Sequence, residues 1–368
     1  MKIAFVSDTH FGFSRFYNDA RERGEIAILD ACKKAEILLL GGDIFDERRP
    51  SIDTLTNVAL LLQRAQKMLP ESNFPKILGI HGTHELGSKD SINPLAMMAM
   101  LGLMEDVHNK TCLIEHKSQN GQTEKIAISG MGGIPDDLVK SAFSKLSCKP
   151  IKGATNFFLF HQTLQEYVPQ AKNLAAIEDL PAGYDYYLCG HIHSKKEYIN
   201  SRLFIPGSTV LTQQKDEEQN PKGYFIFDTL SKTREFIEIP VRPFTVIDLH
   251  FENASSTQVR LRIEQELLSI LSKKWGKAPI IKLRLLGSLE KSSGNLDLSS
   301  FNPKDAYLTI DNQLKGSSLL DDLQKLKEGH FSRKSPHELG ISLLKENAKK
   351  ANLDPKKAEE YFERFSAD

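Results

Sequence analysis

Metal-binding side chains stand directly after five separate apolar runs of this chain. The blocks are Asp8-Thr9-His10, Gly42-Asp43, Gly82-Thr83-His84-Glu85, His161 and Gly190-His191-Ile192-His193, and the runs before them cover residues 2–7, 37–40, 77–80, 157–160 and 186–189. Short, continuous apolar runs predict strands that are buried on both faces. In an open α/β sheet, binding sites form beyond the carboxyl ends of the strands. We therefore expect the five blocks to converge in one crevice.

Each block alone has an ordinary structural explanation, such as a helix cap, a turn or a strand-end histidine whose polar atoms are satisfied. Five blocks that all follow a predicted strand favour a common site. Aspartates and histidines gathered at one point suit a pair of divalent transition metals. Paired metals of this kind hydrolyse phosphoesters.

Residues 1–240 alternate strand-like and helix-like segments, which predicts parallel strands covered by helices. Helices are expected at 18–35, 53–68, 93–103 and 135–146. Shorter strands at 202–205, 223–228 and 234–239 predict an antiparallel portion. The charged run at 213–222 is interpreted as a solvated loop.

Two prolines, Pro240 and Pro243, interrupt strand pairing and predict a domain boundary. Beyond them the pattern predicts a compact α+β unit, with strands at 245–251, 279–286 and 306–311 and helices at 257–273 and near 319–327. Two helices follow in a tail, where Ser335 and Asp354 are expected N-caps with proline next. The expected domains are a catalytic domain at 1–240, a capping domain at 241–329 and a helical tail at 330–368.

Composition limits the possible partners. The chain has 48 Lys and Arg against 48 Asp and Glu, so any contact with nucleic acid must use local patches. The four cysteines form no C-x-x-C pair, which argues against structural zinc and is typical of a reducing compartment. A strand is expected from residue 2, which leaves no room for a signal peptide, and no apolar run has the length of a membrane span. We expect a cytoplasmic protein.

The expected crevice divides into two metal sites that share the Asp43 carboxylate. Asp8, His10 and His193 complete one site, and Thr83, His161 and His191 surround the other. His191 and His193 alternate along an extended segment, so they reach two metals only if the chain bends at Gly190. His84 is left as the general acid for the departing alkoxide.

These blocks resemble the motifs of the calcineurin-like metallophosphoesterases, as Asp8-x-His10-x-Gly12, Gly42-Asp43-Ile44-Phe45-Asp46, Gly82-x-His84-Glu85, His161-Gln162 and Gly190-His191-Ile192-His193. Three further segments are similar to the SbcD/meiotic-recombination-eleven nuclease family, namely Phe45-Asp46-x-x-Arg49-Pro50-Ser51, Gly207-Ser208 and Val241-Arg242-Pro243-Phe244. The resemblance covers residues 1 to about 330.

The resemblance implies a four-layer α/β sandwich, two sheets flanked by helices, with a smaller α+β capping domain. It implies a nuclease with two Mn²⁺ per subunit that degrades duplex DNA from its ends and cuts single strands internally. It also implies a homodimer, a nucleoid-associated location and a partner ATPase of the SMC-like SbcC type. By motif position, the metal ligands are Asp8, His10, Asp43, Thr83, His161, His191 and His193, and the catalytic residue is His84. DNA contacts are expected at Arg48, Arg49 and Ser208.

One position departs from the family pattern. Most members carry asparagine before the catalytic histidine, and its amide oxygen binds the second metal, whereas this chain has Thr83. Glu85 replaces a common aspartate, and Asp46 stands where some members have histidine. The second metal site is then weaker, or ligated differently with His81 as a candidate, or completed only when DNA binds.

Two apolar helices predict the dimer, through Leu55, Val58, Leu61 and Leu62 of one and Met97, Met98, Met100, Leu101 and Met104 of the other. The tail helices predict a docking surface for the ATPase, and folding back on the capping domain is the alternative. Two other functions remain open at this stage. One is a phosphatase for small phosphoesters or phosphoproteins, and the other is a DNA-tethering subunit in which Thr83 marks lost catalysis.

Overall fold

The computed structural model describes residues 1–16, 18–87, 92–117, 123–168, 170–171, 173–290 and 296–315, with isolated positions between 341 and 357. The expected helix near 319–327 lies outside the described residues. So does nearly all of the expected tail at 330–368, including its cap at Ser335.

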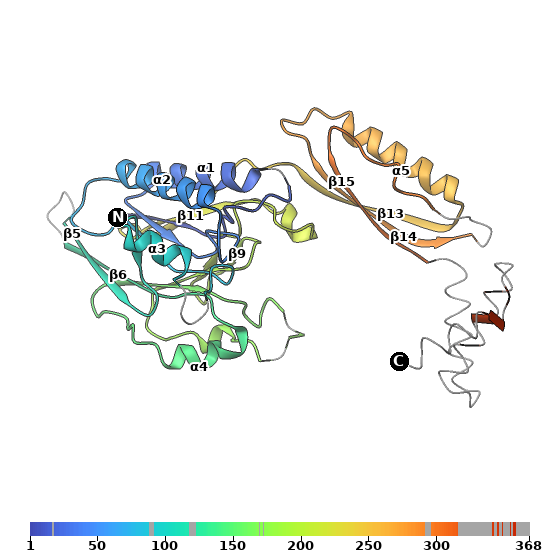
Figure 1. The fold of residues 1–368 in the computed structure, drawn as a ribbon. Helices are drawn as coiled ribbons and strands as arrows, with labels where there is room; N and C mark the ends of the chain where they lie inside the picture. Colours follow the sequence, from blue (N-terminus) through green and yellow to red (C-terminus); the bar gives the residue numbers. More distant parts are fainter. Residues whose placement is uncertain are drawn as a thin grey trace. The chain divides into compact units, whose positions relative to one another are not determined.

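Two six-stranded sheets form the first part of the chain (Figure 1). The first sheet has the order β12 (Thr233–Glu238), β11 (Gly223–Asp228), β1 (Lys2–Val6), β2 (Ile37–Leu40), β3 (Ile77–Gly79) and β4 (Glu105–Asp106). The second has the order β5 (Thr111–Lys117), β6 (Thr123–Met131), β7 (Thr155–His161), β8 (Tyr186–Gly190), β10 (Leu203–Ile205) and β9 (Lys196–Tyr198). Strands β1 to β4 run parallel, as do β6, β7, β8 and β10.

The alternation of side chains along the central strands builds three apolar layers, because successive residues of a strand face opposite sides of the sheet. In β1, Ala4 and Val6 pack under the helices, while Ile3 and Phe5 face the second sheet. The same division occurs in β7, where Phe158 and Phe160 pack on the outer side. The result is the predicted four-layer sandwich.

Helices close both outer faces of the sandwich (Figure 1). The first sheet is covered by α1 (Asp19–Lys34), α2 (Ile52–Met68) and α3 (Pro94–Met100), and the second by α4 (Val139–Ser144). Three short 3₁₀ turns complete the connections: η1 (Asp136–Leu138), η2 (Ile177–Asp179) and η3 (Asp216–Gln219). Serine and asparagine caps start two of the helices, since Ser51 accepts from Thr54 N and Asn93 from Ala96 N.

The described chain divides into two compact units, the first with residues 1–245 and 277–280 and the second with 246–276 and residues from 281 on. The second unit packs α5 (Ser256–Leu271) on a sheet of β13 (Phe244–Ala254), β14 (Ile280–Leu289) and β15 (Tyr307–Lys315). Ser255 and Gln258 start α5 with a reciprocal capping box.

Most of the residues expected at a dimer interface instead pack within the chain. Leu55, Val58, Leu61 and Leu62 of α2 pack in the core beneath the first sheet, together with Met97, Met98 and Met104. Only Met100 and Leu101 of the proposed set stay exposed, at 72% and 60%. The apolar circumference of α3 is therefore used mostly for packing within the chain.

Candidate metal centre

The five predicted blocks all lie at the carboxyl ends of parallel strands, three in the first sheet and two in the second. Hydrogen bonds join the two sheets at this edge. The amide of His191 donates to both carboxylate oxygens of Asp8 at 3.1 Å. His161 Nδ1 lies 2.8 Å from the carbonyl oxygen of Gly41, to which it donates. One crevice therefore collects residues that are up to 185 positions apart (Asp8 to His193).

Two groups of candidate ligands share this crevice. Asp8, His10 and His193 form the first group, and Asp43, His161 and His191 form the second. In each group the possible ligand atoms all lie within 4.8 Å of one another. The alternating histidines His191 and His193 thus join different groups, as expected from their spacing.

The ring nitrogens of these groups are arranged to receive cations. His161 Nε2 is buried and lies 3.1 Å from Asp43 Oδ2. His10 Nε2 and His193 Nε2 face each other at 3.1 Å. Neutral imidazole nitrogens and carboxylates are the donor set that first-row divalent metals accept. The residues present therefore fit the divalent metals that the motifs imply.

The backbone around these ligands adopts conformations that few residues tolerate. Asp8, His10, Asp43 and His191 all have φ between 48° and 76°. Such left-handed conformations are costly for residues other than glycine and cluster at functional sites. The positive φ of His191 supplies the bend that brings its ring into the second group.

Glycines at two of the blocks let the segments approach each other. Gly42 has φ +93°, and a Cβ there would lie 2.6 Å from His161 Nδ1. A Cβ on Gly190 would lie 2.4 Å from the carbonyl oxygen of Gly41. Any side chain at either position would push the strand ends apart and separate the ligands.

Burial and the neighbouring carboxylates set the charges in the second group. Burial and the proximity of His161 lower the pKa of His191 to about 3, so its ring is neutral. Burial alone would lower the pKa of His161, but Asp43 raises it to about 9. The same contact holds the pKa of Asp43 far below its usual range. In the absence of metal, His161 and Asp43 therefore form a buried ion pair.

A third group, His10, Asp46 and His84, overlaps the first through His10. His10 Nδ1 lies 3.0 Å from Asp46 Oδ1, which leaves Nε2 directed at His193. Asp46 thus orients the His10 ring, as carboxylates behind ligating histidines commonly do. His84 is 46% exposed, and its Nδ1 lies 2.7 Å from the Asp46 carbonyl oxygen.

Thr83 lies beside Asp43 and His191 of the second group. Its Oγ1 is 3.4 Å from Asp43 Oδ2 and 3.4 Å from His191 Nδ1. His81, the expected alternative ligand, belongs to none of the ligand groups among the described residues. Its ring packs on His108 with centroids 4.9 Å apart, and burial and His108 lower its pKa to about 4.

Glu85 fastens two of the blocks to each other. Its carboxylate is fully buried and accepts from Phe45 N at 2.8 Å and from Gly82 N at 2.7 Å. Burial and the nearby Asp43 raise the pKa of Glu85 to about 7. The glutamate that replaces the common aspartate is therefore a structural tie in this chain.

Burial corrects two expectations about the segment after β10. Ser208 was expected to contact DNA, but it is fully buried, donates to Val210 O at 2.7 Å and accepts from Lys222 Nζ at 2.9 Å. The charged run 213–222 was expected to be solvated, and most of it is exposed, but Glu218 and Lys222 are buried at 6% and 2% exposure. They pair with each other and lie behind His193, a relation that only the folded chain shows.

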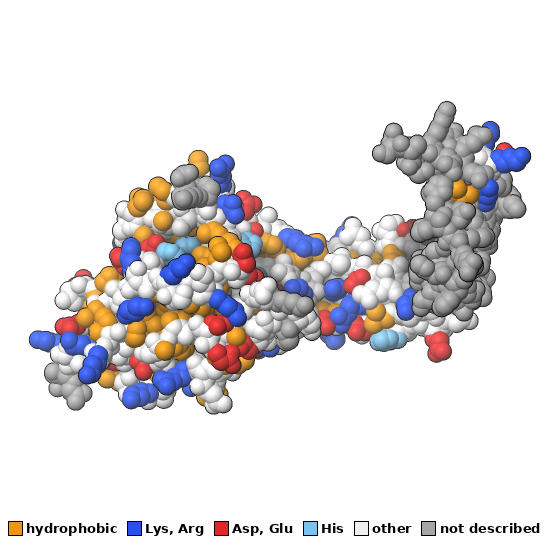
Figure 2. All heavy atoms as spheres, turned by 90° about the horizontal axis from the view of Figure 1, so that it is seen from below, with side chains coloured by type: hydrophobic (Ala, Val, Ile, Leu, Met, Phe, Trp, Pro, Cys, Tyr) orange, Lys and Arg blue, Asp and Glu red, His pale blue; other side chains and the backbone are white. Residues whose placement is uncertain are grey.

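A pocket of about 510 Å³ opens over the ligand groups. His84, His191 and His193 line it, together with Tyr198 and the exposed Lys196. Arg48 and Arg49 are exposed on the segment that follows Asp46. Figure 2 shows basic and acidic side chains interspersed on one face of the molecule, in keeping with the zero net charge.

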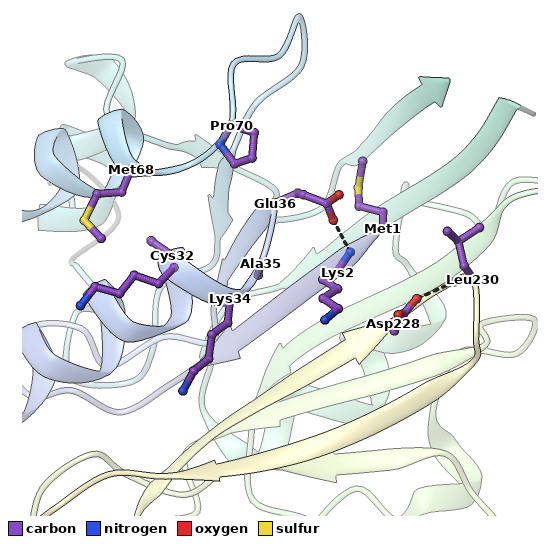
Figure 3. Close-up of a pocket in the computed structure, with 11 residues that line it drawn as sticks. Met1, Lys2, Cys32, Lys34, Ala35, Glu36, Met68, Pro70, Asp228 and Leu230 are labelled. Atoms are coloured by element: carbon purple, nitrogen blue, oxygen red, sulfur yellow. Dashed lines mark hydrogen bonds between the residues drawn. The ribbon is translucent and has the colours of Figure 1, made fainter. Parts of the chain in front are cut away.

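A second pocket, of about 520 Å³, lies at the opposite, amino end of β1 (Figure 3). Its lining includes Met1, Lys2, Cys32 and Met68, and Lys2 N donates to Glu36 across it. None of the ligand groups found among the described residues belongs to this pocket. The chemistry is therefore concentrated at the carboxyl edge of the sheets.

The fold and the two ligand groups agree with the comparison to known families. The chain belongs to the calcineurin-like phosphoesterase family, whose sequence profile matches residues 1–195. Family members use a cluster of divalent metals, which the two ligand groups would hold.

Relatives similar over most of this chain are repair proteins. The DNA double-strand break repair protein Mre11 of Sulfolobus acidocaldarius is 24% identical over 313 residues, which cover 78% of this chain and 76% of that protein. Mre11 of Saccharolobus solfataricus is 24% identical, covering 71% and 70%. The double-strand break repair protein mre-11 of Caenorhabditis elegans is 26% identical, covering 67% and 41%.

Among solved structures, the chain is similar to a calcineurin-like phosphoesterase, YfkN of Bacillus subtilis, with 12% identity and a TM-score of 0.35, covering 65% of this chain and 88% of that one. Within the part of the chain that the structure describes, no helix has both the length and the apolarity to cross a membrane.

Proposed function

We propose that this chain is a manganese-dependent DNA nuclease of a double-strand-break repair complex. It hydrolyses phosphodiesters, degrading duplexes from their ends and cutting single strands internally. The observation that carries the proposal is the pair of ligand groups at the shared edge of the two sheets. Similarity to proteins named Mre11 extends over 78% of the chain, well past the family match at 1–195, and favours DNA over a small phosphoester.

The ligand assignment is the one expected from the sequence. Asp8, His10 and His193 would hold one cation, Thr83, His161 and His191 would surround the other, and Asp43 would be shared by both. When bound, a pair of divalent cations makes water nucleophilic at neutral pH and stabilises the charge that develops on a phosphate. Imidazole-rich sites favour Mn²⁺ over the harder Mg²⁺.

His84 acts as the proton donor to the leaving sugar oxygen. Its backbone N–H donates to Asp43 Oδ1 at 2.8 Å, which fixes the residue beside the ligands. Nδ1 donates to the Asp46 carbonyl oxygen, so Nε2 is the nitrogen free to meet a substrate in the pocket. Its partial exposure suits a group that must reach a bound strand.

Local cations guide the strand, because the chain has no overall basic field. The proposed DNA contacts are Arg48 and Arg49 on the rim of the pocket and the expected capping domain at 241–329. The tail at 330–368 is the proposed attachment for an SMC-like, SbcC-type ATPase. A chain without residues 331–368 is then expected to keep its nuclease activity and to lose co-purification with the ATPase.

The decisive test measures cleavage of linear duplex DNA with Mn²⁺, beside hydrolysis of a chromogenic phosphodiester. His84→Ala should lower DNA cleavage by about 10²–10⁴-fold, the usual contribution of a general acid. Calorimetry should show that the same variant still binds Mn²⁺. His116→Ala, on the edge strand β5, is the matched control and should cleave normally.

The other functions give different results in this assay. A phosphatase would hydrolyse the chromogenic ester and leave the duplex intact, and a tethering subunit would bind DNA without cutting either substrate. Loss of Mn²⁺ binding in His84→Ala would overturn the assignment of His84 as a proton donor.

A further inference from the structure

A buried ion pair lies directly behind the candidate ligand His193. Glu218 belongs to η3 and Lys222 immediately precedes β11, and Lys222 Nζ is 2.5 Å from Glu218 Oε2. Both side chains are almost fully buried, with 2% of the Lys222 side chain and 4% of the Glu218 side chain exposed. Desolvating two charges is costly, so a buried pair is weak evidence for a stabilising role. Its neighbours indicate a different one.

Lys222 uses all three of its ammonium donors. Besides Glu218, it donates to Ser208 Oγ at 2.9 Å and to the carbonyl oxygen of His193 at 2.9 Å. The same carbonyl also accepts from Ser208 N at 3.1 Å. The ammonium group therefore fixes the backbone of the loop that presents His193 to the metal centre.

Glu218 faces the ring of the same histidine. Its Oε1 is 3.4 Å from His193 Nδ1, and Thr212 Oγ1 lies 2.6 Å from that nitrogen. The other ring nitrogen, Nε2, is 3.7 Å from Asp8 Oδ1 and 3.1 Å from His10 Nε2. A carboxylate on the Nδ1 side favours the tautomer with its proton there, which leaves the Nε2 lone pair for a cation.

We propose that Glu218 and Lys222 are positioning residues that hold His193 in the orientation and tautomer needed to bind a divalent cation. Lys222 fixes the loop and Glu218 fixes the ring. Neither touches the reacting groups. This inference rests on the proposed metal centre, and it assigns to the charged run 213–222 a role that its composition does not suggest.

The test is calorimetric titration of the full chain with Mn²⁺ alone, in the absence of DNA. Glu218→Gln keeps the shape of the side chain and an acceptor for Lys222 but removes the charge behind the ring. We expect it to weaken one of the two Mn²⁺ sites about 10–100-fold, as loss of such outer partners does. Lys222→Met should weaken the same site, and the other site should bind as in the wild type.

Lys125→Met is the matched control, because Lys125 also pairs with a glutamate, Glu115, at 2.8 Å, but on the exposed face of β5 and β6. It should leave both sites unchanged. Thermal unfolding of each metal-free variant, recorded separately, distinguishes lost stability from lost affinity. If Lys222→Met fails to fold, Glu218→Gln decides the question.

Two negative outcomes are distinct. A wild-type chain that binds no Mn²⁺ overturns the proposed metal centre itself. A wild-type chain that binds two ions, with Glu218→Gln binding both as tightly, overturns only the inference that the pair positions His193. In that case the pair would be a structural element, and its loss would appear in the melting temperature alone.

Discussion

At the scale of single residues, Thr83 stands where the family resemblance leads us to expect an asparagine. Its hydroxyl stands 3.4 Å from both Asp43 Oδ2 and His191 Nδ1, beside the second ligand group. Thr83→Asn adds a longer side chain with a carbonyl oxygen. It should tighten the second Mn²⁺ about tenfold, equivalent to about 1.4 kcal/mol. Thr83→Val, which removes the hydroxyl at similar size, should weaken the same site.

Calorimetry with Mn²⁺ measures both changes. Equal affinity in the asparagine variant and the wild type would mean that another group already completes the site.

His161 gives a prediction about pH. In the metal-free chain Asp43 raises the pKa of His161 to about 9, against 6.5 for an ordinary histidine, so the ring is protonated at pH 7. Metal binding requires the neutral ring and must release this proton. The affinity for Mn²⁺ should therefore rise by nearly tenfold from pH 7 to pH 8, and the rise should stop once pH passes the pKa of the metal-free form.

Titrations in two buffers with different ionisation enthalpies count the protons released. An affinity that does not change between pH 7 and pH 8 would show that His161 is already neutral before the metal binds.

At the scale of elements, the strands that carry ligands could be predicted because their apolar runs are unbroken. β1, β2, β3, β7 and β8 begin within two residues of the expected positions. Residue patterns alone did not predict which of these strands pair with one another, and the structure divides them between two sheets. Strand β4, at the edge of the first sheet, and strands β5 and β6 of the second sheet were not predicted. Polar residues such as Glu115 and Lys125 interrupt their apolar pattern, and strand pairing depends on contacts distant in sequence.

The charged segment before β11 contains two buried residues that could not be predicted from the sequence. From the sequence we expected Glu218 and Lys222 to be exposed to solvent, because charged side chains are rarely buried unless they are paired. Their pairing partners, which include the His193 loop, lie close only in the folded chain. The ligands themselves were predictable since their residue types are costly or uncommon at strand ends. The groups that orient them have no such signature in sequence.

A further element, the start of α1, anchors the segment that connects the two units. Arg242 donates to both carboxylate oxygens of Asp19 and, at 2.7 Å, to Ala278 O. Both charged side chains are largely buried, at 10% and 6% exposure. Among the residues that the structure describes, Arg242→Ala leaves the buried Asp19 with Lys277, 3.5 Å away, as its cationic partner. It should lower the free energy of unfolding by about 3 kcal/mol, the lower end for a broken buried pair.

Urea unfolding of the full chain provides the measurement. Arg64→Ala is the control, because Arg64 of α2 pairs with Glu25 of α1 at 2.6 Å but both side chains are exposed. That change should cost less than about 1 kcal/mol. Equal losses in the two variants would contradict the importance assigned to burial.

At the scale of the whole molecule, the site exists only because two sheets meet. The first sheet supplies Asp8, His10 and Asp43, and the second supplies the remaining three histidines. The hydrogen bonds from His191 N to Asp8 and from His161 to Gly41 O cross between the sheets at this edge. The apolar layer between the sheets, with Phe5, Leu39 and Phe157 in it, therefore fixes the distance between the ligands that the first sheet supplies and those that the second supplies.

The homodimer expected from the sequence also belongs to this scale, and the structure leaves few of the residues expected at its interface exposed. Most apolar residues of α2 and α3 pack within the chain, but Met100 and Leu101 are exposed, as is Ile52 at the start of α2 at 80%. Exposed apolar groups close together are a common feature of protein interfaces. The double variant Met100→Glu, Leu101→Glu places two charges on this surface and should convert the dimer to a monomer at micromolar concentration.

Light scattering decides between the two states, because a single chain has a mass of 41.4 kDa and the dimer twice that value. Leu268→Glu is the control, since Leu268 is 70% exposed on α5 of the other unit and should leave the mass unchanged. Unfolding midpoints of the variants must be compared at the same chain concentration, since the stability of a dimer depends on it. A wild-type chain of monomeric mass would show that this surface does not join two copies. A double variant that stays dimeric would place the interface on a different part of the molecule.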